Sequence, residues 1–181
     1  MPEWKSFTFG EDGEATPTAE APTPASANPA MEPDEYAAKW GTEVSEVTIA
    51  RIEAVLEGDG LPHGSSEFIA FTQLEDIPFQ VHREPADAPW AQIETRILPV
   101  GEGHTEASLQ AIANRWNTEH LQPTVFPIES EDGWILVAAS RFFVGEGLSD
   151  RQIHAMLRRG LIIGVSAAQE VPSFFDEASA D

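Results

Sequence analysis

The chain has 181 residues, and 31 acidic side chains against 10 Lys and Arg give it a formal net charge of −21 at pH 7. This charge argues against binding nucleic acid through its phosphates and against docking on an anionic membrane, since both need basic surface. The absence of cysteine excludes disulfide bonds, thiolate metal sites and a cysteine nucleophile. No apolar run approaches the ~20 residues of a membrane-spanning helix, and the N-terminus has no secretory pattern, so we expect a soluble cytoplasmic protein.

The composition changes near residue 35. Residues 1–35 contain six of the 14 prolines, eight acidic residues and one Lys, and between Gly13 and Ala30 there is no Val, Ile, Leu or aromatic residue. Such a segment buries too little apolar surface to offset the entropy lost on ordering. We therefore expect an acidic, Pro/Ala-rich disordered tail over 1–35, one domain over 36–172, and an acidic C-terminal tail over 173–181.

The first predicted helix covers about residues 45–57, because apolar residues recur there on one face of a 3.6-residue period. Ser45 is its expected N-cap, and the glycines of Gly58-Asp59-Gly60 end it. The apolar face consists of Val44, Val47, Ile52, Val55 and Leu56.

Three strands are predicted next, over 67–73, 77–83 and 90–98, because each is rich in branched or aromatic residues or alternates between apolar and polar side chains. Glu75-Asp76 forms a tight turn between the first two. A second helix over about 106–120 begins at the N-cap Thr105 and is stopped by Pro123.

Two further strands, 124–129 and 134–144, are joined by a turn that ends in Asp132-Gly133, a strong hairpin signal. The second of them is almost entirely apolar, which indicates a central strand with both faces covered. On the preceding helix, Trp116 lies on the apolar stripe and is expected in the core. Trp90 and Trp134 begin strands, where they either cap the core or line the mouth of a groove.

The last helix covers about 150–169, and Ser149 with Gln152 forms its capping box. Gly160 and Gly164 have the spacing of close helix packing in a soluble domain. The second half of the helix is apolar almost all round, so it needs cover on several sides, and a second subunit is one way to supply it. The candidate dimer or partner interface is Ile162, Ile163 and Val165.

The order of elements is therefore helix, three strands, helix, two strands, helix. Hairpin connections make the strands antiparallel, so the predicted class is α+β, with a twisted antiparallel sheet covered by helices.

No motif predicts catalysis. The five histidines show no i+3 or i+4 pairing, and no serine stands in a G-x-S-x-G context. Asp59 and His63 could join a metal site, but a polar loop explains them better. We therefore predict no catalytic, cofactor or metal-binding residue and no enzyme; a histidine beside a serine or a carboxylate pair in a pocket would revive a hydrolase.

Two segments carry a family resemblance. Residues 109–117 (LQAIANRWN) with 123–126 (PTVF), and residues 51–61 (RIEAVLEGDGL), resemble the YbjN-type family of bacterial sensory transduction regulators. Together with the hairpin and the final capping box, the resemblance extends over roughly 44–171. It implies a fold similar to that of type III secretion chaperones, commonly dimeric, and it implies no catalytic residues because the activity of the family is poorly defined.

The favoured function is a non-enzymatic homodimer that binds a protein or peptide in a groove or on a strand edge, with its acidic charge steering basic segments toward it. The alternative is a signalling or assembly accessory whose N-terminal tail binds elsewhere through Trp4, Phe7 and Phe9.

Overall fold

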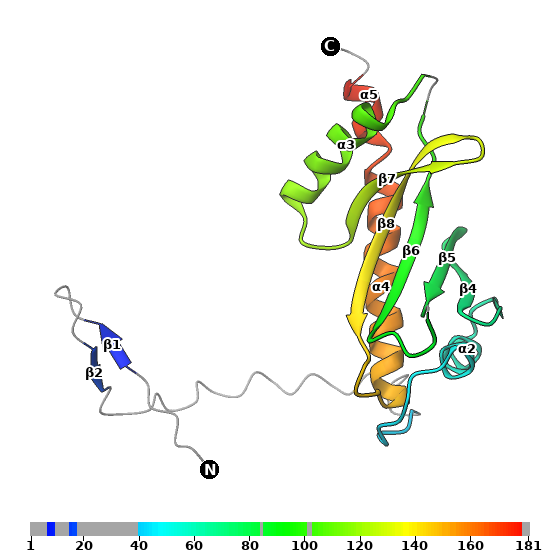
Figure 1. Ribbon diagram of the computed structural model, residues 1–181, viewed down its shortest axis with the longest axis vertical. Helices are drawn as coiled ribbons and strands as arrows, with labels where there is room; N and C mark the ends of the chain where they lie inside the picture. The colour runs from blue at the N-terminus through cyan, green and yellow to red at the C-terminus, as the bar shows by residue number, and fades with distance from the viewer. Residues whose placement is uncertain (1–6, 10–14, 18–39, 84, 101–102, 179–181) are drawn as a thin grey trace. The chain divides into compact units, whose positions relative to one another are not determined.

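A computed structural model describes residues 7–9, 15–17, 40–83, 85–100 and 103–178 (Figure 1). The chain divides into two units, residues 1–33 and residues 34–181. In the first unit, β1 (Phe7–Phe9) and β2 (Ala15–Pro17) form an antiparallel pair, which the composition of the predicted tail did not indicate. Trp4 lies outside the described residues. All the other strands and all the described helices belong to the second unit.

Six antiparallel strands form one sheet in the order β3-β4-β5-β6-β8-β7, which confirms the α+β class. From β3 to β6 each strand pairs with the next one in the chain. Strand β6 then pairs with β8, and β7 pairs with the other side of β8 and forms an edge of the sheet. The strands are β3 (His63–Ser65), β4 (Ile69–Leu74), β5 (Ile77–His82), β6 (Trp90–Ile97), β7 (Thr124–Ser130) and β8 (Gly133–Phe143).

The helices pack against one face of this sheet, where two clusters of buried apolar side chains form the core. Figure 1 shows the longest helix, α4, running along the sheet behind β6 and β8. Gly160 and Gly164 allow this close approach, because a Cβ at either position would collide with Ile93 or Phe79. The helices are α2 (Ile49–Gly58), α3 (Glu106–Glu119), α4 (Asp150–Glu170) and α5 (Ser173–Ala178).

The helix caps agree with the sequence in two cases and differ in one. Thr105 caps α3, and the Ser149 capping box begins α4. Helix α2 begins later than predicted: Thr48 is its N-cap, whereas Ser45 forms an isolated bridge with Leu148. The reason is tertiary, since the Arg51 guanidinium donates hydrogen bonds to the carbonyls of Ser45, Glu46 and Leu148 and so holds this segment extended.

Two elements were not predicted. Strand β3 is only three residues long and contains a glycine, so it has no detectable alternation. Helix α5 occupies the segment expected to begin the C-terminal tail, and Phe175 is fully buried in the second core cluster. The packed fold therefore continues past residue 172, because α5 adds an aromatic side chain to the core.

The link from α3 to β7 is fixed by side chains of α3. Trp116 is buried, as predicted, and its Nε1 donates a hydrogen bond to the Pro123 carbonyl at 2.9 Å. Asn117 both donates to the Val125 carbonyl (2.7 Å) and accepts from its N–H (2.9 Å). These bonds set the position at which β7 begins, and with it the end of β7's pairing with β8.

Candidate functional site

The face of the sheet opposite the helices has no helix over it among the described residues; we call it the open face. Its side chains alternate along each strand with those of the core, so Ala91 and Ile93 are buried while Gln92 and Glu94 lie on the other side. Trp90 and Phe143 are 50% and 53% exposed. Their rings meet edge-on at 5.3 Å, which forms an exposed aromatic pair at one end of this face.

The two strand-initial tryptophans of the sequence analysis thus have different surroundings. Trp134 is partly buried and packs against the second core cluster, as a residue that caps the core would. Trp90 is instead half exposed on the open face and lines a cavity there. The groove interpretation therefore fits Trp90 alone.

A row of polar side chains crosses three strands of the open face. His82 on β5 places Nε2 3.1 Å from Glu94 Oε1 on β6. Gln92 donates from its amide nitrogen to Glu94 Oε2 at 2.6 Å, and its amide oxygen accepts from Arg141 Nε on β8 at 2.7 Å. Each member orients the next, so the Arg141 side chain is held in place through Gln92.

The pKa of Glu94 reflects this row. Burial raises its pKa, but hydrogen bonds from His82 and Gln92 and the positive charges of His82 and Arg96 outweigh burial and lower it below its ordinary value. Glu94 is therefore ionised at neutral pH.

The two arginines of the open face differ from those at the edges of the core. Arg51 forms an ion pair with Asp150, and Arg83 with Glu46. Arg96 and Arg141 are exposed, and no carboxylate of the described residues forms an ion pair with either. In a chain with three times more acidic than basic residues, two such cations on one surface are a notable feature.

Beside Arg141 the edge of the sheet is stepped. Strand β7 pairs with β8 only as far as Ala139, whereas β6 continues to Phe143. Among the described strands, residues 140–143 of β8 consequently have a neighbour on one side alone. We call the gap between this stretch and the start of β7 the notch.

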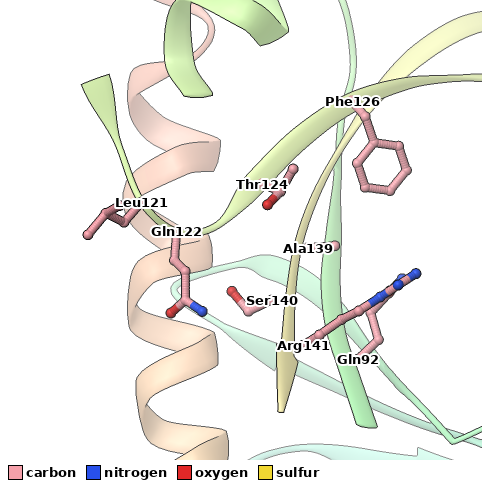
Figure 2. A pocket seen from close by; sticks show the side chains of 8 residues that line it. All are labelled: Gln92, Leu121, Gln122, Thr124, Phe126, Ala139, Ser140 and Arg141. Atoms are coloured by element: carbon pink, nitrogen blue, oxygen red, sulfur yellow. The ribbon is translucent and has the colours of Figure 1, made fainter. Parts of the chain in front are cut away.

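A cavity of about 390 Å³ lies in the notch (Figure 2). Figure 2 shows Gln122 and Thr124 on one side of it and Ser140 and Arg141 on the other. Ser140 is 2% exposed, and its Oγ has no hydrogen-bond partner among the described residues. A second cavity, of about 400 Å³, includes Trp90 in its lining and shares Gln92 and Arg141 with the first. The Gln92–Arg141 pair thus lines both cavities, each of a size typical of ligand sites.

The predicted interface on α4 is only partly at the surface. Ile162 is 49% exposed and Ile163 is partly buried, but Val165 is 7% exposed and belongs to the first core cluster. Val165 is therefore corrected from an interface residue to a core residue. The cause is the sheet, which covers this side of the helix and which the apolar pattern of α4 could not distinguish from a second subunit.

Ile162 borders a cavity of about 310 Å³ between α4, the β4–β5 turn and the segment after α2. His154 also borders it, and His154 Nδ1 lies 2.8 Å from Asp59 Oδ2. Asp59 is thus joined to His154 rather than to His63, whose Nδ1 contacts the Leu61 carbonyl. Sequence reasoning missed this pair because its members are 95 residues apart.

The Asp59–His154 pair is mostly buried and connects two helices. His154 is 4% exposed, and the described residues that line this cavity contain no Ser, Thr or Cys that it could activate. The pair joins the C-cap of α2 to α4. Within the described ranges, no group of three or more His, Asp or Glu could hold a metal ion, and no helix is long and apolar enough to span a bilayer.

Residues 48–171 match the protein family described as "YbjN: Putative bacterial sensory transduction regulator". The chain belongs to the YbjN family. A solved structure with a similar fold is that of "YbjN, a putative transcription regulator from E. coli", with a TM-score of 0.55 and 15% identity. The similarity covers 76% of this chain and 96% of the E. coli chain and shows a shared fold.

No curated protein sequence matches this chain. The family and the α+β fold expected from the sequence are both confirmed. The similarity to type III secretion chaperones stays a prediction.

Proposed function

We propose that this YbjN-family protein is a non-enzymatic, cytoplasmic regulatory module that binds an extended segment of a partner protein on its open face. The observation that carries the proposal is the one-sided sheet, whose open face ends in the exposed Trp90–Phe143 pair. Half-exposed aromatic side chains that already contact each other are typical anchors of protein interfaces, because they bury a large area at little entropic cost.

The notch supports an extended partner rather than a helical one. A strand edge presents unpaired N–H and C=O groups that a further strand can bind. Residues 140–143 of β8 are such an edge within the described sheet, next to the aromatic pair.

The test is affinity purification from the native host with four proteins: the full chain, a chain lacking residues 1–35, the double variant Trp90→Ala/Phe143→Ala, and Val44→Ala as a control. Val44 is exposed but lies outside the open face. A partner that the truncated chain and the control retain, and that the double variant loses, supports the proposal. A partner lost on truncation and retained by the double variant favours the N-terminal tail as the binding element.

We further propose that two copies associate through Ile162 and Ile163. Ile162 borders a cavity whose lining includes Leu61, Leu74 and Leu161, so the surface around it is largely apolar. A two-fold axis needs a self-complementary patch, and an apolar patch can contact its own copy.

Light scattering tests the dimer. Ile162→Glu is expected to give a monomer, because it places a charge in the centre of an apolar contact. Val44→Glu, at a similarly exposed position elsewhere, is expected to leave the dimer intact. A dimer that persists in Ile162→Glu would contradict this placement.

A further inference from the structure

We propose that the notch is a binding site for an acidic, extended peptide, in which a carboxylate of the peptide pairs with Arg141 and its main chain adds to residues 140–143 of β8. This inference rests on the proposed function and specifies the chemistry of the partner. It differs from the expectation drawn from net charge, by which an acidic protein attracts basic segments.

Local charge, rather than net charge, decides the partner at this position. The formal charge of −21 acts over long distances and is screened by salt beyond about 10 Å at 0.1 M ionic strength. The charged side chains around the notch are Arg141, which lines it, Arg159, whose guanidinium lies 3.5 Å from the Gln122 amide oxygen of its lining, and Glu94, which lines the adjoining cavity. Glu94 is already bound by His82 and Gln92, whereas neither arginine has an ion pair among the described residues. The group that would complete this surface is a carboxylate.

Arg141 is prepared for such a group. Its Nε is committed to Gln92, and no hydrogen bond within the described part of the chain uses its two terminal nitrogens. A guanidinium held by one nitrogen keeps a planar pair of donors for the two oxygens of a carboxylate. Because the Gln92–Glu94–His82 row fixes the side chain beforehand, less rotamer entropy is lost on binding.

An unsatisfied hydroxyl lies on the opposite side of the strand from Arg141. Ser140 Oγ is buried without a partner among the described residues and borders the notch, and in Figure 2 it points from β8 toward Gln122. Buried polar groups in folded proteins are almost always hydrogen-bonded. A peptide main chain, with a donor and an acceptor at each residue, is a ligand that can supply the missing bond.

The strand geometry also predicts a spacing within the peptide. Arg141 and Phe143 lie two residues apart on β8, so their side chains emerge on the same face. A strand added beside them would place every second side chain on this face. The expected ligand therefore carries an Asp or Glu beside Arg141 and, two residues away, an apolar or aromatic residue beside Phe143 and Trp90.

The experiment selects phage-displayed random dodecapeptides on the full-length protein and measures a synthetic peptide of the enriched sequence by fluorescence anisotropy. Enrichment of an acidic residue two positions from an apolar one is expected. Arg141→Glu should weaken binding of this peptide by about tenfold or more, because one charge-assisted pair is lost. The same variant should bind a peptide that carries Lys in place of the acidic residue more tightly than it binds the original peptide. Arg141→Gln should give a smaller loss in the same direction.

Arg151→Glu is the matched control, since Arg151 is an exposed arginine at the start of α4 and borders neither cavity. It makes the same change in net charge and is expected to leave peptide affinity within about twofold, because exposed charges beyond the site are screened by salt. Circular dichroism and the thermal midpoint of each variant test whether the fold is unchanged, as expected for substitutions at the exposed Arg141 and Arg151.

Three results would overturn the inference: enriched peptides without an acidic residue, equal weakening by Arg141→Glu and Arg151→Glu, or a change of oligomeric state in Arg141→Glu in place of a change in peptide affinity. The proposed function fails separately. If peptides are selected and Trp90→Ala weakens them while Arg141→Glu does not, the open face binds a partner but the acidic specificity is wrong. If no peptide is enriched and no partner is purified, both fail.

Discussion

The two faces of the sheet differ in what their side chains do. On the helix-covered face the strands contribute apolar residues that are fully buried against α2, α3, α4 and α5. On the open face the same strands contribute a hydrogen-bonded polar row, a half-exposed aromatic pair and two arginines without an ion pair among the described residues. Stability is therefore concentrated on one face and the proposed binding on the other, which substitutions in matched pairs can test.

The largest contrast is expected between two tryptophans. Trp116 is buried on the covered side, and its replacement by Ala should lower the free energy of unfolding by about 3–5 kcal/mol, through a cavity and the lost bond to Pro123. Trp90→Ala, at a half-exposed site on the open face, should cost about 1 kcal/mol or less. Chemical denaturation of both variants measures the difference, and equal losses would contradict the division between the faces.

A smaller contrast is expected between two glycines. A side chain at Gly160 would collide with Ile93 on the covered face, so Gly160→Ala should destabilise the fold by about 1–3 kcal/mol through overpacking. Gly64 has no atom within 4 Å of the position a Cβ would take, so Gly64→Ala should be close to neutral. Thermal unfolding compares the pair; a neutral Gly160→Ala would mean that α4 does not press against the sheet as closely as described.

The smallest effect concerns the open face and depends on pH. The pKa of Glu94 in the folded protein lies below its ordinary value of 4.5, so the unfolded chain takes up this proton first as the pH falls. The stability that Glu94 contributes is complete above pH 4.5 and is lost as the pH falls through the lower folded value. Glu94→Gln should remove this contribution, so its stability should fall less steeply below pH 4.5 than that of the unchanged protein.

His82→Gln is the control for this pH dependence. It removes one of the charges that lower the pKa of Glu94, so the acid-induced loss should be smaller and should be complete nearer to pH 4.5. Identical pH profiles for Glu94→Gln and the unchanged protein would show that the row contributes nothing to stability.

Much of the covered face could be predicted from the sequence. The apolar periodicity of α3 and α4, their caps at Thr105 and Ser149, and the burial of Trp116 follow from patterns within one element. The errors occur where another element intervenes. Arg51 holds the segment before α2 extended by binding carbonyls from two parts of the chain, and the sheet covers Val165 where a second subunit was expected.

The open face could be predicted much less. The alternation of β6 does place Gln92, Glu94 and Arg96 on one polar side, and Arg141 is a visible exception in an apolar strand. What joins them is the register between β6 and β8, which sets Gln92 opposite Arg141 across 49 positions of sequence. A single sequence carries no direct signal of such a pairing.

By itself, the sequence determined the α+β class, the family, most helices and strands, and the absence of cysteine chemistry, because these depend on composition and on short-range periodicity. Only the tertiary structure decided which side of each strand lies against helices, where β7 stops along β8, and that Arg96 and Arg141 lie on the open face without an ion pair among the described residues. These features depend on contacts between distant segments, and their energies come from packing and from charges brought together by folding rather than from the preferences of any one stretch of chain.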